Sequence, residues 1–476
     1  MPATLTAAER LDRLAVSTFH RRTAALLAYV FFFELGDLNS FAYAAPALRQ
    51  QWQLSIQTIA TITSASFVGM FVGAMTAGTL SDHVGRRRAL LLTTIWYSSM
   101  SLLNACAWSV PSLFAARLLT GVGLSGMTVV AMTYIGEMFP SRVRGAFQAR
   151  ILMFGLFGIP ATAYVARFAV PQAGWGWRVV FVWGALAIFF PFFARLLEES
   201  PRWLERRGRK EEAEAILARI ERESALAAPP AEGPAAAAAG PAVAGPKGPA
   251  LQADEGRAGP FGPAGPSEGR PGPVGPGESI GIKGLIRSGF GGRALLLIGV
   301  WFCQTLGFYG FNAWVPTLLA EQGFSIMRTL EQSSAIAIGA VPGAWVASKI
   351  ADRWERKYLI AAVAVLVGTF GMIYGLSFNT WVIVVFGFLV AMSQQVFAPM
   401  LYAYTAECFP TNARNTGAGM SYGIGRLGNA IGPLIVAFLF TNYGYRSVFA
   451  YIAVCWVLVA MLILAFGPRM NQRTLA

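Results

Sequence analysis

Two acids and one arginine stand out in this chain because they lie inside long runs of apolar residues. Of the 24 Asp and Glu residues, only Glu34 and Asp37 fall well inside such a run. Arg426 lies about ten residues into another run, which would place it near the middle of a lipid bilayer. Ionisable side chains are costly in lipid, so those found there commonly mark a substrate pathway or a proton relay.

The types and spacing of these residues favour proton and anion chemistry. Glu34 and Asp37 are three residues apart, so on a helix they share one face. Because burial disfavours a charged carboxylate and two charged neighbours repel each other, the pair could take up and release a proton near neutral pH. The guanidinium group of Arg426 is well shaped to bind a carboxylate, which makes it the candidate anchor for an anionic substrate. The alternative is structural: one acid pairs with an arginine to hold helices together, or Arg426 bonds backbone carbonyls or Asp37.

Several aromatic and polar side chains fall at a depth similar to that of the two acids. A planar, mostly apolar substrate with one charge would suit such a lining, and core packing is an equally good explanation for each ring. Besides Arg426, the candidate substrate-binding residues are Phe41, Tyr43, Gln304, Tyr309, Asn312 and Trp314.

The composition places the elements that hold these residues in a membrane. Hydrophobic residues make up 55% of the chain and charged residues 13%, and the mean hydropathy is +0.51. Apolar runs of roughly 20 residues, each long enough to cross a ~30 Å hydrocarbon core, can be placed about twelve times. The predicted spans are 24–47, 56–81, 88–107, 111–135, 145–168, 177–197, 293–319, 330–350, 358–377, 380–405, 416–440 and 445–467.

A repeat with an offset of 270 residues divides these spans into two sets of six. The block from Gly78 to Arg88 returns at Ser348 to Lys357, and Tyr134 to Arg144 returns at Tyr404 to Arg414. Gly69 and Gly73 likewise match Gly339 and Gly343. A period this long indicates two copies of one domain, as in many transporters. The predicted fold class is therefore an all-α membrane protein with 12 transmembrane helices in two six-helix halves.

The repeated blocks carry acids and arginines between short-connected spans. Such charges can pair across the inner face in one conformation and separate in another, so we predict a conformational latch. An alternative is that the cations satisfy only the inside-positive bias of membrane proteins, which explains the arginines but not the repeated acids. The predicted latch residues are Gly78, Asp82, Gly85, Arg86, Arg87, Glu137, Arg144, Asp352, Arg356, Glu407 and Arg414.

Charge and composition also predict the domain organisation and its orientation. Lys and Arg concentrate at the N-terminus and in every second loop, which places both termini and the central linker in the cytoplasm. The formal net charge of +14 follows mostly from these loops, and no basic stripe with aromatic residues indicates nucleic-acid binding. The predicted parts are a cytoplasmic N-terminus (1–23), a six-helix bundle (24–197), a cytoplasmic helical segment (198–224), a mostly disordered Gly/Pro/Ala-rich linker (225–290), a second six-helix bundle (291–467) and a cytoplasmic tail (468–476).

The loops further indicate a location. Residues 1–22 lack the apolar stretch of a cleavable signal peptide, so the first span is expected to direct insertion. The outer loops carry neither thiols nor Asn-x-Ser/Thr acceptors, which favours a bacterial inner membrane. We expect no cofactor and no metal, and nothing in the sequence resembles the nucleophile, base or phosphate loop of an enzyme.

With these motifs in order, the chain resembles the major facilitator superfamily over nearly its whole length outside the linker. The block from Gly78 to Arg88 looks like the loop signature of that family. The run Arg117-x-x-x-Gly121-x-Gly123-x-x-Gly126 looks like its fourth-helix motif, and Glu199 to Leu204 looks like a segment shared by sugar porters and organic-ion transporters.

The first span is similar to that of bacterial aromatic-acid and nicotinate proton symporters. Their Asp-Gly-x-Asp pattern corresponds here to Glu34-x-Gly36-Asp37, with Glu in place of the first Asp and the glycine shifted by one. The resemblance implies proton-coupled uptake of a small organic acid, aromatic or carboxylic, by alternating access. Asp37, Glu34 and Arg117 would couple the proton, and the protein would act in the bilayer as a monomer with a small molecule and protons as its partners.

Three other functions remain open at this point. A proton-driven antiporter could use Glu34 or Asp37 as counter-ion to an organic cation or drug, although Gly155-x-x-Gly158-x-Pro160 only partly resembles the fifth-helix signature of such antiporters. A sugar porter agrees with Glu199 to Leu204 but not with the spacing from Gln304 to Asn312. A transporter-like nutrient sensor would need a signalling motif in the linker, where none is recognisable.

Overall fold

The computed structural model describes residues 6–227, 282–350 and 354–470. Its regular elements are all helices, and no strand occurs among the described residues. Most of the predicted disordered linker and the predicted latch residue Asp352 lie outside the described residues.

Each predicted span corresponds to one helix or to a broken helix, which confirms the predicted fold class. The first half contains α2 (Thr18–Trp52), α3 (Ile56–Val84), α4 (Arg86–Ala105), α5 (Val110–Met138), α6 (Ser141–Leu156) with α7 (Gly158–Ala169), and α8 (Gly176–Gly184) with the 3-10 helix η1 (Ala185–Leu196). The second half contains α12 (Gly291–Asn312) with α13 (Val315–Glu321), α14 (Ile326–Ala337) with α15 (Ala340–Ile350), α16 (Arg356–Leu376), α17 (Thr380–Glu407), α18 (Thr411–Gly425) with α19 (Leu427–Tyr443), and α20 (Tyr445–Phe466).

Among the described residues, ten of these segments are long and apolar enough by themselves to cross a membrane. The other two of the twelve are α4 and the α14–α15 pair. Three consecutive arginines at the start of α4 reduce its mean hydropathy, and α14 is separated from α15 at Gly339. The break there has a local cause, because Pro342 has no N–H to donate to the carbonyl of Ile338.

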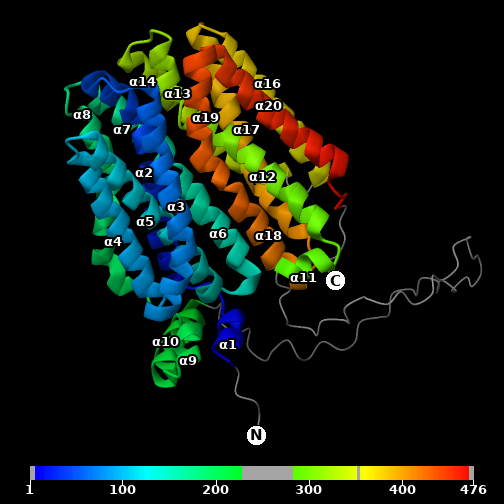
Figure 1. Cartoon of the computed structure of the whole chain (residues 1–476). Helices are drawn as coiled ribbons and strands as arrows, with labels where there is room; N and C mark the ends of the chain where they lie inside the picture. The colour runs from blue at the N-terminus through cyan, green and yellow to red at the C-terminus, as the bar shows by residue number, and fades with distance from the viewer. Residues whose placement is uncertain (1–5, 228–281, 351–353, 471–476) are drawn as a thin grey trace, which may run out of the picture.

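The two halves lie side by side, the first in blue to blue-green and the second in bright green through yellow to red (Figure 1). Four short helices lie at one end of the bundle: α1 (Ala7–Arg13), α9 (Pro201–Arg206), α10 (Lys210–Ala227) and α11 (Ile282–Arg287). We call this the linker end and the other the opposite end. The predicted charged segment after residue 198 is thus two helices, and α10 and α11 both extend into the range predicted to be mostly disordered.

The glycines that carry the repeat are positions of close helix contact. A Cβ atom on Gly69 of α3 would lie 1.9 Å from the carbonyl oxygen of Leu118 in α5. In the second half, a Cβ on Gly343 of α15 would lie 2.3 Å from the carbonyl oxygen of Met392 in α17. Both helix pairs therefore approach too closely for any side chain larger than hydrogen, which explains why the two halves share these glycines.

Polar contacts between the halves occur at the opposite end. Arg49 at the end of α2 pairs with Glu321 of α13, and the Arg167 guanidinium lies 3.0 Å from a carboxylate oxygen of Glu331 in α14. Gln57 at the start of α3 donates a hydrogen bond of 2.8 Å to Thr441 near the end of α19. These contacts tie the halves together where α13 and α14 lie (Figure 1).

Candidate functional site

Glu34 lies at the contact between the two halves. The residue is 4% exposed, and its carboxylate accepts a hydrogen bond of 2.9 Å from Thr128 of α5. It also interacts electrostatically with Arg426 of the second half. The predicted acid and the predicted arginine, nearly 400 residues apart in the sequence, therefore lie near each other.

Arg426 joins α18 to α19, and its backbone angles (φ −63°, ψ −19°) remain close to helical. Its guanidinium donates one hydrogen bond to the hydroxyl of Tyr422 and one, of 3.3 Å, to Ser125 of α5. The guanidinium carbon also lies 4.3 Å from the centroid of the Tyr422 ring. Since Ser125 and Thr128 are three residues apart on α5, one face of that helix holds both members of the Glu34–Arg426 pair.

Asp37 is enclosed within the first half instead. It is fully buried, and its Oδ1 accepts a hydrogen bond of 2.5 Å from Ser101 of α4. Gly184 packs directly against the carboxylate, since a Cβ there would lie 2.2 Å from Oδ1. Arg117 of α5, itself 2% exposed, lies 4.0 Å from Oδ2. The two predicted acids thus have different surroundings: Glu34 bonds Thr128 and lies near Arg426, and Asp37 lies beside Arg117.

Arg117 connects Asp37 to a small cavity between the halves. Its guanidinium donates a hydrogen bond of 2.9 Å to Ser66 of α3 and lies 5.6 Å from the centroid of Phe41. Across the cavity, Tyr309 of α12 packs against Phe67 of α3 with ring centroids 4.7 Å apart. The lining residues are Leu38, Asn39, Phe41, Ala42, Thr63, Ser66, Phe67, Arg117, Tyr309 and Ala313.

The remaining predicted substrate-binding residues do not line this cavity. Tyr43 and Trp314 are buried in the hydrophobic core. Asn312 donates a hydrogen bond of 2.6 Å to Gln394 of α17, and Gln304 is a buried neighbour of Thr305 on α12. The cavity therefore combines two of the predicted rings, Phe41 and Tyr309, with Arg117.

Sequence reasoning missed the polar residues of α3 that line the cavity. Thr63, Ser66 and Phe67 have the spacing of one helix face, so the pattern was present. Hydroxyl groups are common in membrane helices, however, because they can bond their own backbone, as Thr63 does to the carbonyl of Ile59 at 2.8 Å. The pattern alone could not tell a cavity lining from a helix contact.

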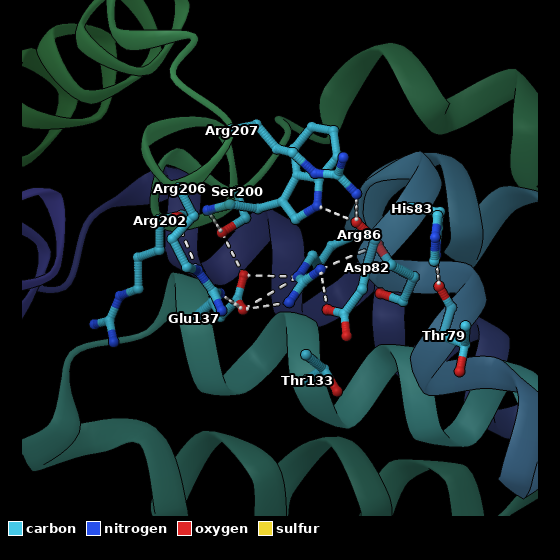
Figure 2. A network of polar contacts seen from close by, with 12 residues as sticks. Thr79, Asp82, His83, Arg86, Thr133, Glu137, Ser200, Arg202, Arg206 and Arg207 are labelled. Atoms are coloured by element: carbon cyan, nitrogen blue, oxygen red, sulfur yellow. Dashed lines mark hydrogen bonds and ion pairs between the residues drawn. The ribbon is translucent and has the colours of Figure 1, made fainter. Parts of the chain in front are cut away.

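Asp82, Arg86 and Glu137, three of the predicted latch residues of the first half, meet at the linker end in the network of Figure 2. Arg86, only 3% exposed, lies 2.9 Å from Glu137 and 2.8 Å from Asp82. Glu137 also accepts hydrogen bonds of 2.5 Å from Ser200 and 2.7 Å from Arg206. The network therefore includes residues 200–206, which precede or belong to α9, as well as the predicted block.

The start of α4 depends on the same segment. Gly85 has a φ of +98°, and a Cβ there would lie 2.5 Å from Glu199, so glycine is required. Glu199 accepts hydrogen bonds from the backbone N–H groups of Arg86 and Arg87 at 2.8 and 3.0 Å. A carboxylate thus caps the N-terminus of α4, a favourable place for negative charge. Gly78 has no such requirement, because a Cβ there would meet nothing within 4 Å.

The predicted charge networks differ from the observed ones in their partners. Arg144 does not join Glu137 but lies 3.7 Å from Asp12 and donates to the carbonyl of Phe139. In the second half, Glu407 pairs with Arg356, and Arg414 donates to the carbonyl of Ala406. Each network described here stays within its own half and the helices attached to it.

Removing the charge of Glu137 should destabilise the protein, because the buried Arg86 would lose its main partner. We expect Glu137→Gln to lower the free energy of unfolding by about 2 kcal/mol. Thermal unfolding of the purified protein in detergent measures this effect. Glu211→Gln, at an exposed position of α10, is the matched control, and equal unfolding temperatures for both variants would contradict the prediction.

A bundle of two related halves, with charged groups facing each other at mid-depth, defines a membrane transporter. The Major Facilitator Superfamily profile matches residues 27–378 and 333–475. The chain belongs to this superfamily and is a transporter rather than an enzyme. No cluster suited to hold a metal ion occurs among the described residues.

Several characterised or named relatives are similar along nearly the whole chain. The putative metabolite transport protein YyaJ of Bacillus subtilis is 40% identical over 98% of this chain and 96% of its own length. The niacin transporter NiaP of Acinetobacter baylyi is 27% identical over 98% of each chain. The gallate transporter of Pseudomonas putida is 28% identical over 98% of this chain and 95% of its own length.

Solved structures agree on the fold. The xylose transporter XylE of E. coli, in a partially occluded inward open conformation, superimposes with a TM-score of 0.70. The match covers 96% of this chain and 100% of the other at 18% identity. At this identity the likeness concerns the fold alone.

Proposed function

We propose that this protein imports a small planar organic acid together with protons. The observation that supports the proposal is the placement of Glu34 and Arg426 on one face of α5, where Glu34 accepts a hydrogen bond from Thr128 and Arg426 donates one to Ser125. A substrate carboxylate and the Glu34 carboxylate would compete for the same guanidinium group. Protonation of Glu34 would release Arg426, so the anion and the proton would bind together.

Asp37 and Arg117 form the second part of the proposed coupling machinery. The pair is buried within the first half, and Arg117 also borders the cavity through Phe41 and Ser66. A change in the charge of Asp37 would alter its electrostatic attraction to Arg117. Because Arg117 borders the cavity, the shape of the cavity would change as well. This gives proton binding a route to the contact between the halves.

Alternating access would use the contacts at the two ends of the bundle. We assign the linker end to the cytoplasm because its loops carry the arginines. The pairs of Arg49 with Glu321 and Arg167 with Glu331 would then close the outer side. In the outward-facing state these pairs would separate, and the charge networks at the linker end would contact each other across the halves.

The relatives support an aromatic acid as the substrate class. Niacin and gallate, named as the substrates of two of them, are both flat rings that carry a carboxylate. The same relatives are bacterial, which supports a bacterial inner membrane as the location. We further propose that the monomer is the functional unit, since each half contributes to one site.

Uptake by proteoliposomes tests the proposal. Vesicles that contain the purified protein and have an imposed inward proton gradient would be offered labelled aromatic acids, aliphatic acids, amines and sugars. We expect accumulation of acids that collapses when a protonophore removes the gradient. Extrusion of amines, or gradient-driven uptake of sugars without uptake of acids, would overturn the proposal.

A further inference from the structure

Three aromatic rings gather beside Arg426 in the second half. They belong to Trp301 of α12, Tyr402 of α17 and Tyr422 of α18, and we call them the aromatic triad. The ring centroid of Trp301 lies 4.7 Å from that of Tyr402 and 4.9 Å from that of Tyr422. Those of Tyr402 and Tyr422 lie 5.2 Å apart. Three helices thus contribute one ring each to a single aromatic surface.

Two members of the triad are held firmly in place. The indole N–H of Trp301 donates a hydrogen bond of 3.0 Å to Thr405. Gly425 allows α18 to approach, because a Cβ there would lie 2.4 Å from the Cβ of Trp301. Tyr422 is fixed by its hydroxyl contact and its ring contact with Arg426. Rigid supports of this kind suit a surface that selects a ligand by shape.

Tyr402 is the member that presents a free ring face. Its side chain is 48% exposed, although its hydroxyl interacts electrostatically with Arg426, Tyr422 and Tyr309. Tyr309 in turn packs against Phe67 of the first half. The ring of Tyr402 thus lies beside Tyr422, which itself stacks on Arg426, so a ligand bound to Arg426 is within reach of it.

The guanidinium of Arg426 retains binding capacity for a ligand. Among the described residues, its hydrogen bonds use one N–H toward Ser125 and one toward Tyr422. A guanidinium has five N–H donors, so a carboxylate can be added to these contacts. Because Tyr422 is one turn nearer to the linker end than Arg426, a ring attached to that carboxylate can lie over the triad.

We infer that the aromatic triad recognises the ring of the substrate, with Tyr402 as the residue that determines the preference for aromatic over saturated acids. The inference rests on the proposed function, because it requires that Arg426 binds the substrate carboxylate. The flat ring packs on the exposed face of Tyr402, where offset or edge-to-face contact is favourable. A puckered, saturated ring of the same size loses this contact and keeps the contact with Arg426.

Binding of benzoate and cyclohexanecarboxylate to the purified protein tests this inference, because the two probes share one carboxylate and differ in the ring. Wild type is expected to bind benzoate more tightly. Tyr402→Leu should reduce the ratio of the two affinities by about three- to tenfold, which corresponds to the loss of one aromatic contact. Tyr402→Phe keeps the ring and should retain most of the ratio.

Tyr443→Leu serves as the matched control, since Tyr443 is an exposed tyrosine at the end of α19, remote from Arg426. An unchanged ratio in Tyr402→Leu overturns the inference, and so does equal affinity or absence of binding of both probes in wild type. Failure of the proposed function gives a different result, because no acid would then be taken up in response to the proton gradient. If only this inference fails, acids are still taken up, and aromatic and saturated acids are taken up equally well.

Discussion

Replacing Glu34 with glutamine should abolish gradient-driven accumulation. Glutamine can still accept the hydrogen bond from Thr128, but it carries no charge to compete for Arg426 and binds no proton. With one coupled proton, a gradient of one pH unit supports about tenfold accumulation, since each unit equals about 1.4 kcal/mol. In the Glu34→Gln variant the ratio of inside to outside substrate should fall to about one, and proteoliposome uptake measures it.

The pH dependence of substrate binding should separate the roles of the two acids. In wild type, affinity for an anionic substrate should rise as pH falls, because protonated Glu34 releases Arg426. The Glu34→Gln variant should bind the anionic substrate with an affinity that no longer changes with pH. Asp37→Asn should lose accumulation but keep the pH dependence of binding, because Asp37 contacts Arg117 and not Arg426. Tenfold accumulation by Glu34→Gln would refute its place in the coupling.

Replacing Arg426 with lysine should weaken the binding of carboxylate substrates by about ten- to a hundredfold. Lysine retains the positive charge but loses the two-pronged contact with a carboxylate and the planar stacking on Tyr422. Equilibrium binding of benzoate to the purified protein measures this loss. Benzamide, which has the same ring and no charge, should bind wild type and variant with similar affinity.

Arg150→Lys provides the control for this substitution. Arg150 lies on α6 beside Phe147, in a helix that carries no part of the proposed site. Its replacement should leave benzoate binding unchanged. Equal benzoate affinity in Arg426→Lys and wild type would remove Arg426 as the anchor of the substrate.

The sequence was informative about features that depend on a single helix. Hydropathy predicted all twelve spans, because the cost of exposing a polar group to lipid acts on each segment separately. The repeat predicted the two halves, and its glycines now have a cause in the close approach of α3 to α5 and α15 to α17. Glu34 and Asp37 were recognisable as buried acids for the same reason.

The sequence was less informative about which charged side chains pair with one another. It placed Glu137 and Arg144 in one predicted latch, whereas Glu137 pairs with Arg86 and Arg206 and Arg144 lies near Asp12. Arg206 could be assigned only because the structure places α9 beside Glu137 of α5 (Figure 2). Long cationic side chains reach several neighbours, so their pairing depends on how helices are placed relative to one another.

The amino-acid sequence by itself determined the membrane fold, its division into two halves and the few ionisable residues at mid-depth, because each follows from local hydropathy and from the repeat. Only the tertiary structure decided that Glu34 lies near Arg426 while Asp37, one turn away, lies beside Arg117. Neighbours on one helix face diverge in this way because Glu34 bonds Thr128 of α5, one turn from the Ser125 that Arg426 bonds, whereas Asp37 lies beside Arg117 earlier in the same helix. Packing between helices, which no single segment encodes, therefore separates the two acids into different environments.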